Sequence, residues 1–187
     1  MKPGRYLHRG EVSPVESGEA TARPRDHGAR LRWLTYYLGE DPLGGEHWRS
    51  DQSNAQLAST VEAGFSTTAA EFLRRRTGMS VRIFGQIIPR STLQSKRMRA
   101  DTKLSPRQSD RVMQVAALYA HAAEVFGSSE HAVKWMKRTN PQMPGERTPE
   151  EMTGTSYGLC VVDDALTRIE HGVAPCPRRH YLVVLSV

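Results

Sequence analysis

The residues best suited to binding chemistry in this 187-residue chain are cations gathered in one segment. Between residues 66 and 111, eleven Lys and Arg side chains accompany only Glu71, Asp101 and Asp110. The stretch from Arg90 to Arg99 contains no acid at all. Because each nucleic-acid phosphate is negative, such an imbalance is typical of a DNA-binding surface. The alternative interpretation is an ordinary solvated face on a helical bundle, although such faces usually mix both signs of charge.

Two short helices separated by a tight turn are predicted at the centre of this segment. Ser80 can cap a helix over residues 81–88, which Pro89 ends, and a polar helix follows over residues 91–100. This is a helix-turn-helix pattern, whose second helix enters the major groove of DNA. The candidate base-reading residues are Ser91, Gln94 and Ser95, and the candidate phosphate contacts are Arg90, Lys96, Arg97 and Arg99.

Residue types that carry enzyme or metal chemistry are scattered along the chain. The cysteines Cys160 and Cys176 form no CxxC pair, and the seven histidines form no HExxH motif. Asp163 and Asp164 do not suit paired catalytic carboxylates, because neighbours on a helix point about 100° apart. We therefore interpret them as surface acids and expect a protein that is not an enzyme, with no catalytic residue, metal site or cofactor.

Helical periodicity near the C-terminal end predicts an amphipathic helix over residues 157–172. Its apolar stripe consists of Leu159, Val162, Leu166, Ile169 and Val173. A second stripe beside it consists of Val161, Asp164, Arg168 and His171. Steps of three and four residues place each set on one side of a helix. An amphipathic helix usually packs its apolar side in a core, and we expect Leu159, Val162, Leu166 and Ile169 to face the protein's own core.

The strongest helix signals lie between these two segments. Ser105, Pro106 and Gln108 form a capping-box start, and Gly127 stops the long helix that follows. Thr67 or Thr68 can cap an earlier helix that ends before Gly78. Ser128 or Ser129 can cap the next one. The chain is therefore predicted to be all-α.

The two ends of the chain lack this regularity. Residues 1–28 mix charges with Pro and Gly and cannot bury enough apolar area to fold alone, so we predict a flexible N-terminal tail. An aromatic-rich stretch over residues 29–38 has helical character. Residues 181–187 read as a strand in an atypical tail, either a non-homologous extension or a strand that docks on a partner. No apolar run suits a membrane helix or signal peptide, which favours a cytoplasmic protein without a membrane partner.

Two parts of the chain resemble one known family. Residues 89–127 resemble the helix-turn-helix half of the Xre/MbcA/ParS antitoxins, and residues 132–173 resemble their toxin-binding half. The matching residues of the second half are Trp135, Asn140-Pro141, Gly145, Thr148-Pro149, Gly158, Val162, Leu166, Arg168-Ile169 and His171-Gly172-Val173. Departures are Pro144 where a paired glycine is expected and Met136 where a leucine is usual.

The resemblance implies an Xre-like helix-turn-helix domain followed by a small helical toxin-binding domain. It divides the chain into a mostly disordered or loosely structured extension over residues 1–50, a DNA-binding domain over 51–127, a toxin-binding domain over 128–173 and a tail over 174–187. Within the toxin-binding part, Pro149 is expected to start a short helix and Gly158 to allow a close backbone approach.

The function that the resemblance implies is that of an antitoxin. It would neutralise a RES-domain toxin that acts on NAD, repress its own operon by binding operator DNA, and form a homodimer or a higher hetero-oligomer with the toxin. The implied toxin contacts are Val161, Asp164, Arg168, His171, Gly172 and Val173. The alternative is a stand-alone helix-turn-helix regulator whose C-terminal half dimerises or senses a ligand.

Overall fold

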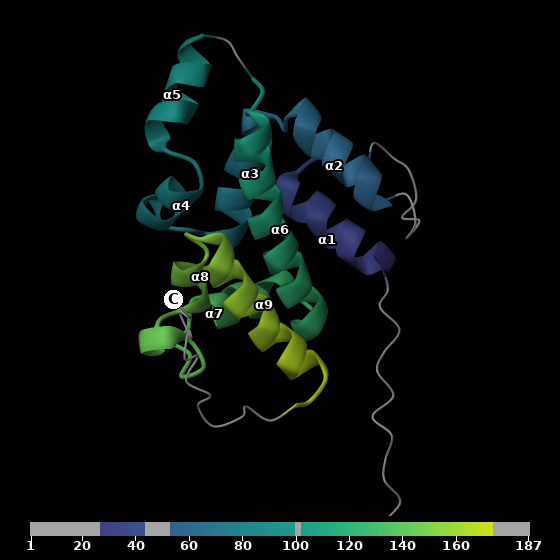
Figure 1. The fold of residues 1–187 in the computed structure, drawn as a ribbon, viewed down its shortest axis with the longest axis vertical. Helices are drawn as coiled ribbons and strands as arrows, with labels where there is room; N and C mark the ends of the chain where they lie inside the picture. The colour runs from purple at the N-terminus through teal and green to yellow at the C-terminus, as the bar shows by residue number, and fades with distance from the viewer. Residues whose placement is uncertain (1–26, 44–52, 100–101, 174–187) are drawn as a thin grey trace, which may run out of the picture.

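The computed structural model describes residues 27–43, 53–99 and 102–173. In these residues all regular structure is helical, which confirms the predicted all-α class (Figure 1). The helices are α1 (His27–Leu38), α2 (Ser53–Ala63), α3 (Thr67–Thr77), α4 (Val81–Ile87), α5 (Arg90–Met98), α6 (Pro106–Phe126), α7 (Ser129–Met136), the 3-10 helix η1 (Pro144–Glu146), α8 (Pro149–Met152) and α9 (Ser156–Glu170). None of the helices in these described residues combines the length and apolar character that a membrane span requires.

Helix α6 is the axis on which the other helices pack. Its start is the predicted capping box, in which the Ser105 hydroxyl accepts from the Gln108 backbone and the Gln108 side chain accepts from the Ser105 backbone. Its end is Gly127, in the left-handed conformation at φ 74°. Helices α1 and α2 cover one side of α6, while α7 and α9 cover its C-terminal half (Figure 1).

Helix α3 begins at a different cap from the predicted Thr67 or Thr68. The Ser66 hydroxyl accepts from the Ala69 backbone N–H at 3.0 Å. The reason is that residues 65–67 pair in extended conformation with residues 102–104, a pairing that sequence periodicity does not show. The Thr67 N–H donates to the Thr102 carbonyl at 2.6 Å and the Leu104 N–H to the Phe65 carbonyl at 2.8 Å. Ser66 is therefore the residue at which the chain turns from an extended pairing into a helix.

Helix α1 belongs to the core, which differs from the predicted loose extension over residues 1–50. Tyr37 and Leu38 are fully buried, and Arg30 Nε donates to the Glu124 carboxylate of α6 at 2.7 Å. The aromatic-rich stretch finds an apolar partner on α6, and sequence periodicity cannot pair two helices so distant along the chain. The flexible tail predicted over residues 1–28 is wrong at residues 27 and 28, which belong to α1. Residues 1–26 and the predicted strand over residues 181–187 lie outside the described residues.

One hydrophobic core joins both halves of the described chain. Leu73 of α3, Phe84 of α4 and Leu166 of α9 all belong to the same cluster of buried side chains as Val115 and Tyr119 of α6. The cluster contains residues from both sides of residue 128, where the sequence suggests a domain boundary. Surfaces on the two halves are consequently held by a shared scaffold.

Two candidate interaction surfaces

The first candidate surface is the helix-turn-helix formed by α4 and α5. Ile83, Phe84 and Ile87 anchor α4 in the core, and Ile88 in the turn is fully buried. Pro89 then takes the cap position of α5 without a side-chain hydrogen bond. Helix α5 itself, which is fully described, has no buried residue. It lies at the edge of the molecule, away from α1 and α2 (Figure 1).

The predicted DNA contacts all lie on α5 or at its end. Six of them are exposed: Arg90, Ser91, Gln94, Ser95, Arg97 and Arg99. Lys96 is half-buried. Ser91 lies in the first turn of α5 instead of capping it, because the helix begins at Arg90. The structure thus brings the predicted residues together on one accessible basic helix.

In the folded protein, an acid from another helix lies beside this acid-free segment. Glu71, on the preceding helix α3, forms an ion pair with the guanidinium of Arg97. The two residues lie 26 positions apart in sequence, so local charge counting cannot detect the contact. Arg97 is consequently partly neutralised, and DNA would have to compete with Glu71 for it.

The second candidate surface is built on α9. Its core-facing residues are Gly158, Leu159, Val162, Ala165 and Leu166. The predicted core-facing positions are correct as far as Leu166 and wrong at Ile169, which is 38% exposed. Val173, one of the implied toxin contacts, is 58% exposed. Helix α9 crosses α6 obliquely (Figure 1). None of the residues of α9 after Leu166 is buried.

Most of the predicted toxin contacts lie on the outer side of α9 or just after it. Asp164, Arg168, His171, Gly172 and Val173 are exposed. Val161 is half-buried and packs against the core. Two further exposed residues, Tyr157 and Cys160, continue the outer stripe towards the start of the helix. Cys160 lies four residues and Tyr157 seven residues before Asp164, a spacing that places all three on the same side of a helix. This spacing is the sequence signal for both residues, and Tyr157 is 72% exposed.

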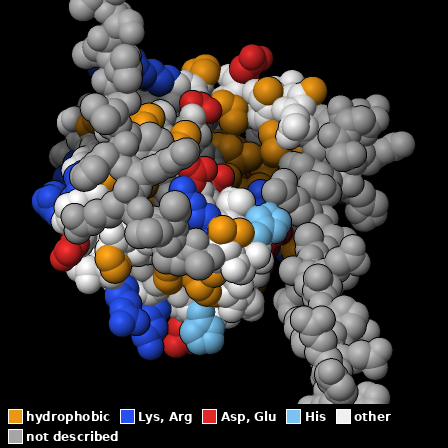
Figure 2. Space-filling model, turned by 60° about the horizontal axis from the view of Figure 1, so that its bottom comes forward, with side chains coloured by type: hydrophobic (Ala, Val, Ile, Leu, Met, Phe, Trp, Pro, Cys, Tyr) orange, Lys and Arg blue, Asp and Glu red, His pale blue; other side chains and the backbone are white. Residues whose placement is uncertain are grey.

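Side chains of several kinds surround this end of the molecule. Figure 2 shows it from below, with apolar, basic, acidic and histidine side chains intermingled. Helix α5 differs in that its charged residues, Arg90, Lys96 and Arg97, are all basic. A mixed surface of apolar and charged groups suits a protein partner better than a polyanion.

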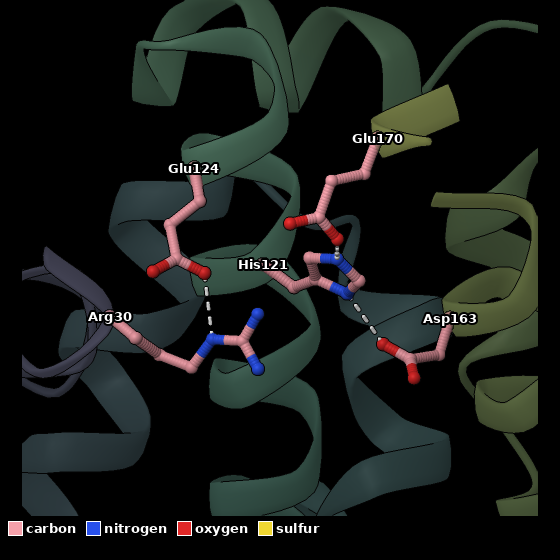
Figure 3. Close-up of polar contacts among 5 residues, drawn as sticks. All are labelled: Arg30, His121, Glu124, Asp163 and Glu170. Carbon is pink, nitrogen blue, oxygen red and sulfur yellow. Dashed lines mark hydrogen bonds and ion pairs between the residues drawn. The ribbon is translucent and has the colours of Figure 1, made fainter. Parts of the chain in front are cut away.

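A buried histidine joins α9 to α6. His121 of α6 is 5% exposed, and its Nδ1 lies 2.7 Å from the Asp163 carboxylate. Its Nε2 lies 3.3 Å from the Glu170 carboxylate (Figure 3). Asp163 is therefore more than the surface acid expected from sequence. Among the described residues, no group of three His, Cys, Asp or Glu side chains is arranged to hold a metal ion.

The short helix α8 brings a buried carboxyl to the same region. Thr148 and Glu151 form a capping box, and a backbone hydrogen bond from Thr148 lowers the pKa of Glu151. The neighbouring Glu150 is buried and accepts a hydrogen bond from the Tyr119 hydroxyl at 3.0 Å. Burial raises the pKa of Glu150, because the charged form loses its hydration.

The turn between α8 and α9 is tightly packed. Arg111 of α6 donates to the Thr153 carbonyl at 2.6 Å, and burial lowers its pKa. A Cβ at Gly158 would lie 2.0 Å from the Met152 carbonyl oxygen, which confirms the predicted close backbone approach. Pro149 occupies the first turn of α8, as predicted. These contacts fix the point from which α9 departs.

Comparison with known proteins matches the second candidate surface, the one built on α9, to a known family. Residues 121–172 match the model of the antitoxin Xre/MbcA/ParS C-terminal toxin-binding domain. The match begins inside α6, at His121, and so includes the part of α6 that supports α9.

Relatives extend the similarity beyond this domain. Antitoxin Xre of Pseudomonas putida strain KT2440 is 31% identical over 120 residues, which are 64% of this chain and 74% of the relative. Antitoxin Xre of Yersinia enterocolitica is 31% identical over 122 residues, which are 63% of this chain and 80% of the relative. Antitoxin Xre of Photorhabdus laumondii is 34% identical over 80 residues, which are 42% of this chain and about half of the relative, 53%. The chain belongs to the Xre/MbcA/ParS family of antitoxins, whose C-terminal domain binds a toxin and which is not a family of enzymes.

Proposed function

We propose that this antitoxin neutralises a RES-domain toxin through the outer side of α9. The observation that carries the proposal is the division of α9 into a buried side and an exposed stripe within the segment matched by the toxin-binding domain. The RES class of the toxin rests on the family resemblance of the sequence.

The outer stripe offers chemistry that fits a nucleotide-using partner. Arg168 is exposed near the end of α9, and a guanidinium can donate two parallel hydrogen bonds to a carboxylate or a phosphate. His171 follows one turn later, and Val173 adds an exposed apolar side chain. We assign Arg168 and His171 to contacts near the toxin's NAD site, with Val161, Asp164, Gly172 and Val173 around them.

Point substitutions test this assignment more sharply than a truncation. Removing α9 would also remove Leu159, Val162 and Leu166 from the core, so loss of rescue would have two explanations. In cells that co-express a RES-domain toxin which the wild-type protein neutralises, Arg168→Ala combined with His171→Ala should abolish rescue from growth arrest. Glu130→Ala, on the exposed side of α7, is the matched control and should rescue fully. Full rescue by the double variant would contradict the assignment.

We also propose that the protein represses its own operon by placing α5 in the major groove of operator DNA. Support comes from the exposure of α5, its cations and its short, buried turn after α4. Ser91, Gln94 and Ser95 are the proposed base-reading residues, and Arg90, Lys96, Arg97 and Arg99 the proposed phosphate contacts. Because helix-turn-helix proteins usually read two half-sites, we further propose a homodimer, or a higher hetero-oligomer with the toxin.

The salt dependence of operator binding tests the phosphate contacts. Lys96→Ala combined with Arg97→Ala should weaken binding and reduce the slope of log K against log salt by about 1 to 2, roughly 1 for Lys96 and less for Arg97, which Glu71 partly neutralises. Gln94→Ala should instead reduce discrimination between operator and random DNA, with the slope retained. Lys134→Ala on α7 is the control for a lost surface cation. An unchanged slope in the double variant would sink the DNA-binding proposal.

A further inference from the structure

The contact between α6 and the end of α9 contains a polar group that packing alone does not require. His121 lies between Ala120 and Ala122, both fully buried, on a helix whose core side is otherwise largely apolar. Both of its ring nitrogens face carboxylates of α9 (Figure 3). An imidazole with a proton on both ring nitrogens can donate to both carboxylates at once. Such a fully partnered buried group fixes one arrangement of its neighbours, because every displaced arrangement leaves a group unpaired.

The two carboxylates hold α9 at two points. Asp163 and Glu170 are seven residues apart, so they lie on the same side of the helix and about 10 Å apart along its axis. Rotation or sliding of α9 over α6 would lengthen at least one of the contacts to His121. The attachment therefore sets both the register and the direction of α9.

The second contact matters most, because the end of α9 lacks an apolar anchor. In the described chain after Leu166, no side chain is buried. This turn carries Arg168 and His171, which face outwards. Glu170, on the inner side of the same turn, is the residue that reaches back to the buried imidazole at 3.3 Å.

A separate ion pair occupies the neighbouring turn of α6. Glu124 lies three residues after His121 but pairs with Arg30 of α1 at 2.7 Å (Figure 3). Its carboxylate is therefore engaged by α1, and the imidazole is left to α9. The His121 contacts can thus be removed without removing the contact that holds α1.

We propose that His121 is a positioning residue for toxin recognition, which holds the last turn of α9 through Asp163 and Glu170 so that Arg168 and His171 face the toxin in a fixed orientation. This role rests on the proposed function of the outer stripe of α9. It concerns the presentation of the contact residues, since His121 itself is buried and touches no partner.

Amide hydrogen exchange of the full-length protein tests the positioning step without the toxin. In His121→Leu the apolar side chain keeps the packing but donates no hydrogen bond, and the amides of His171, Gly172 and Val173 should exchange roughly 10-fold faster. Those of Val112 and Val115 in α6 should keep their rates. His121→Gln can donate from one nitrogen and should give an intermediate rate. Unchanged exchange at residues 171–173, or equal acceleration throughout α6, would overturn the proposal.

Binding to a RES-domain toxin which the wild-type protein neutralises tests the functional consequence. His121→Leu should weaken binding about 10-fold, and adding Glu170→Gln to it should cost little more, since the two act through one contact. His131→Leu, which replaces an exposed histidine on α7, should bind normally. Recovery of part of the affinity in His121→Gln separates positioning from a bulk structural effect.

The proposed function and this inference fail in different ways. If Arg168→Ala removes binding while His121→Leu binds normally, the inference is wrong and the toxin-facing assignment stands. If Arg168→Ala binds normally, the toxin-facing assignment is wrong and His121 loses its role in recognition with it, whatever the exchange rates of residues 171–173.

Discussion

Helices α5 and α9 are both candidate binding helices, but the fold holds them in different ways. Five of the fifteen residues of α9 are buried, whereas none of the nine residues of α5, all of them described, is buried. The orientation of α9 is therefore determined by the core and by His121. That of α5 depends on the buried turn before it and on the ion pair between Arg97 and Glu71.

The difference suits two kinds of partner. A helix whose contact residues are fixed in advance loses little conformational entropy on binding a protein surface. A basic helix tied to the body at few points can adjust in a groove while long-range attraction to phosphates supplies much of the affinity. Substitutions that remove single contacts of α9 or α5 test this contrast.

The largest effect is expected from the buried anchor of α9. Leu166 is fully buried, so Leu166→Ala should lower the free energy of unfolding by about 2–5 kcal/mol through lost burial and a cavity. Met98 on α5 is 84% exposed, and Met98→Ala should change stability by less than about 0.5 kcal/mol. Urea unfolding of the two variants measures the difference. Equal effects would show that the core does not anchor α9 as described.

The junction between α8 and α9 should be the next most sensitive. Gly158→Ala places a Cβ against the Met152 carbonyl and should cost about 1–3 kcal/mol, because backbone must move. Gly85 of α4 has open space around its position, so Gly85→Ala should be neutral or stabilise the protein by about 0.4–1 kcal/mol. Thermal unfolding distinguishes the two, and a tolerated Gly158→Ala would contradict the close approach.

Glu150 gives the C-terminal region a dependence of stability on pH. Burial raises its pKa above the ordinary value of 4.5, so the folded state binds a proton more readily than the unfolded chain. Its contribution to stability is present below pH 4.5 and is lost as the pH rises through the raised pKa. Glu150→Gln can still accept from Tyr119, and at pH 7 it should be more stable than the wild type, by on the order of 1 kcal/mol.

The neighbouring residue Glu151 is a control, because its pKa is shifted in the opposite direction from that of Glu150. The pKa of Glu151 is lowered, so its contribution is present above pH 4.5 and is lost as the pH falls through the lowered pKa. Glu151→Gln should therefore lose stability mainly at neutral pH. Unfolding curves measured between about pH 2 and pH 8 test both signs, and parallel pH profiles for the two variants would contradict the difference in environment.

The smallest effect on stability is expected at α5. Glu71→Gln releases Arg97 from an exposed ion pair, which should change the free energy of unfolding by less than about 1 kcal/mol. If α5 binds DNA, the released cation should increase the magnitude of the salt slope of operator binding by up to about 1. Glu62→Gln removes an exposed acid of α2 and is the control. Reduced operator affinity in Glu71→Gln would show that Glu71 helps to orient Arg97 for binding.

Local signals in the sequence were sufficient for most helix boundaries. The capping box at Ser105, the stop at Gly127 and the close approach at Gly158 depend on residues near one another in the chain, and the structure confirms each. Ser66 was missed as a cap because its conformation depends on pairing with residues 102–104. Helix α1 was placed outside the folded part for a similar reason, since its partner surface lies on α6.

The sequence by itself determined the all-α class, the amphipathic character of α9, the basic character of α5 and the family. The family follows from matching residues spread over two long segments, and the other properties follow from residue order over a few helical turns. Only the tertiary structure decided that Glu71 neutralises Arg97, that the apolar stripe of α9 ends at Leu166 and that His121 holds Asp163 and Glu170. Such contacts join residues tens of positions apart, and the path of the backbone determines which of them meet.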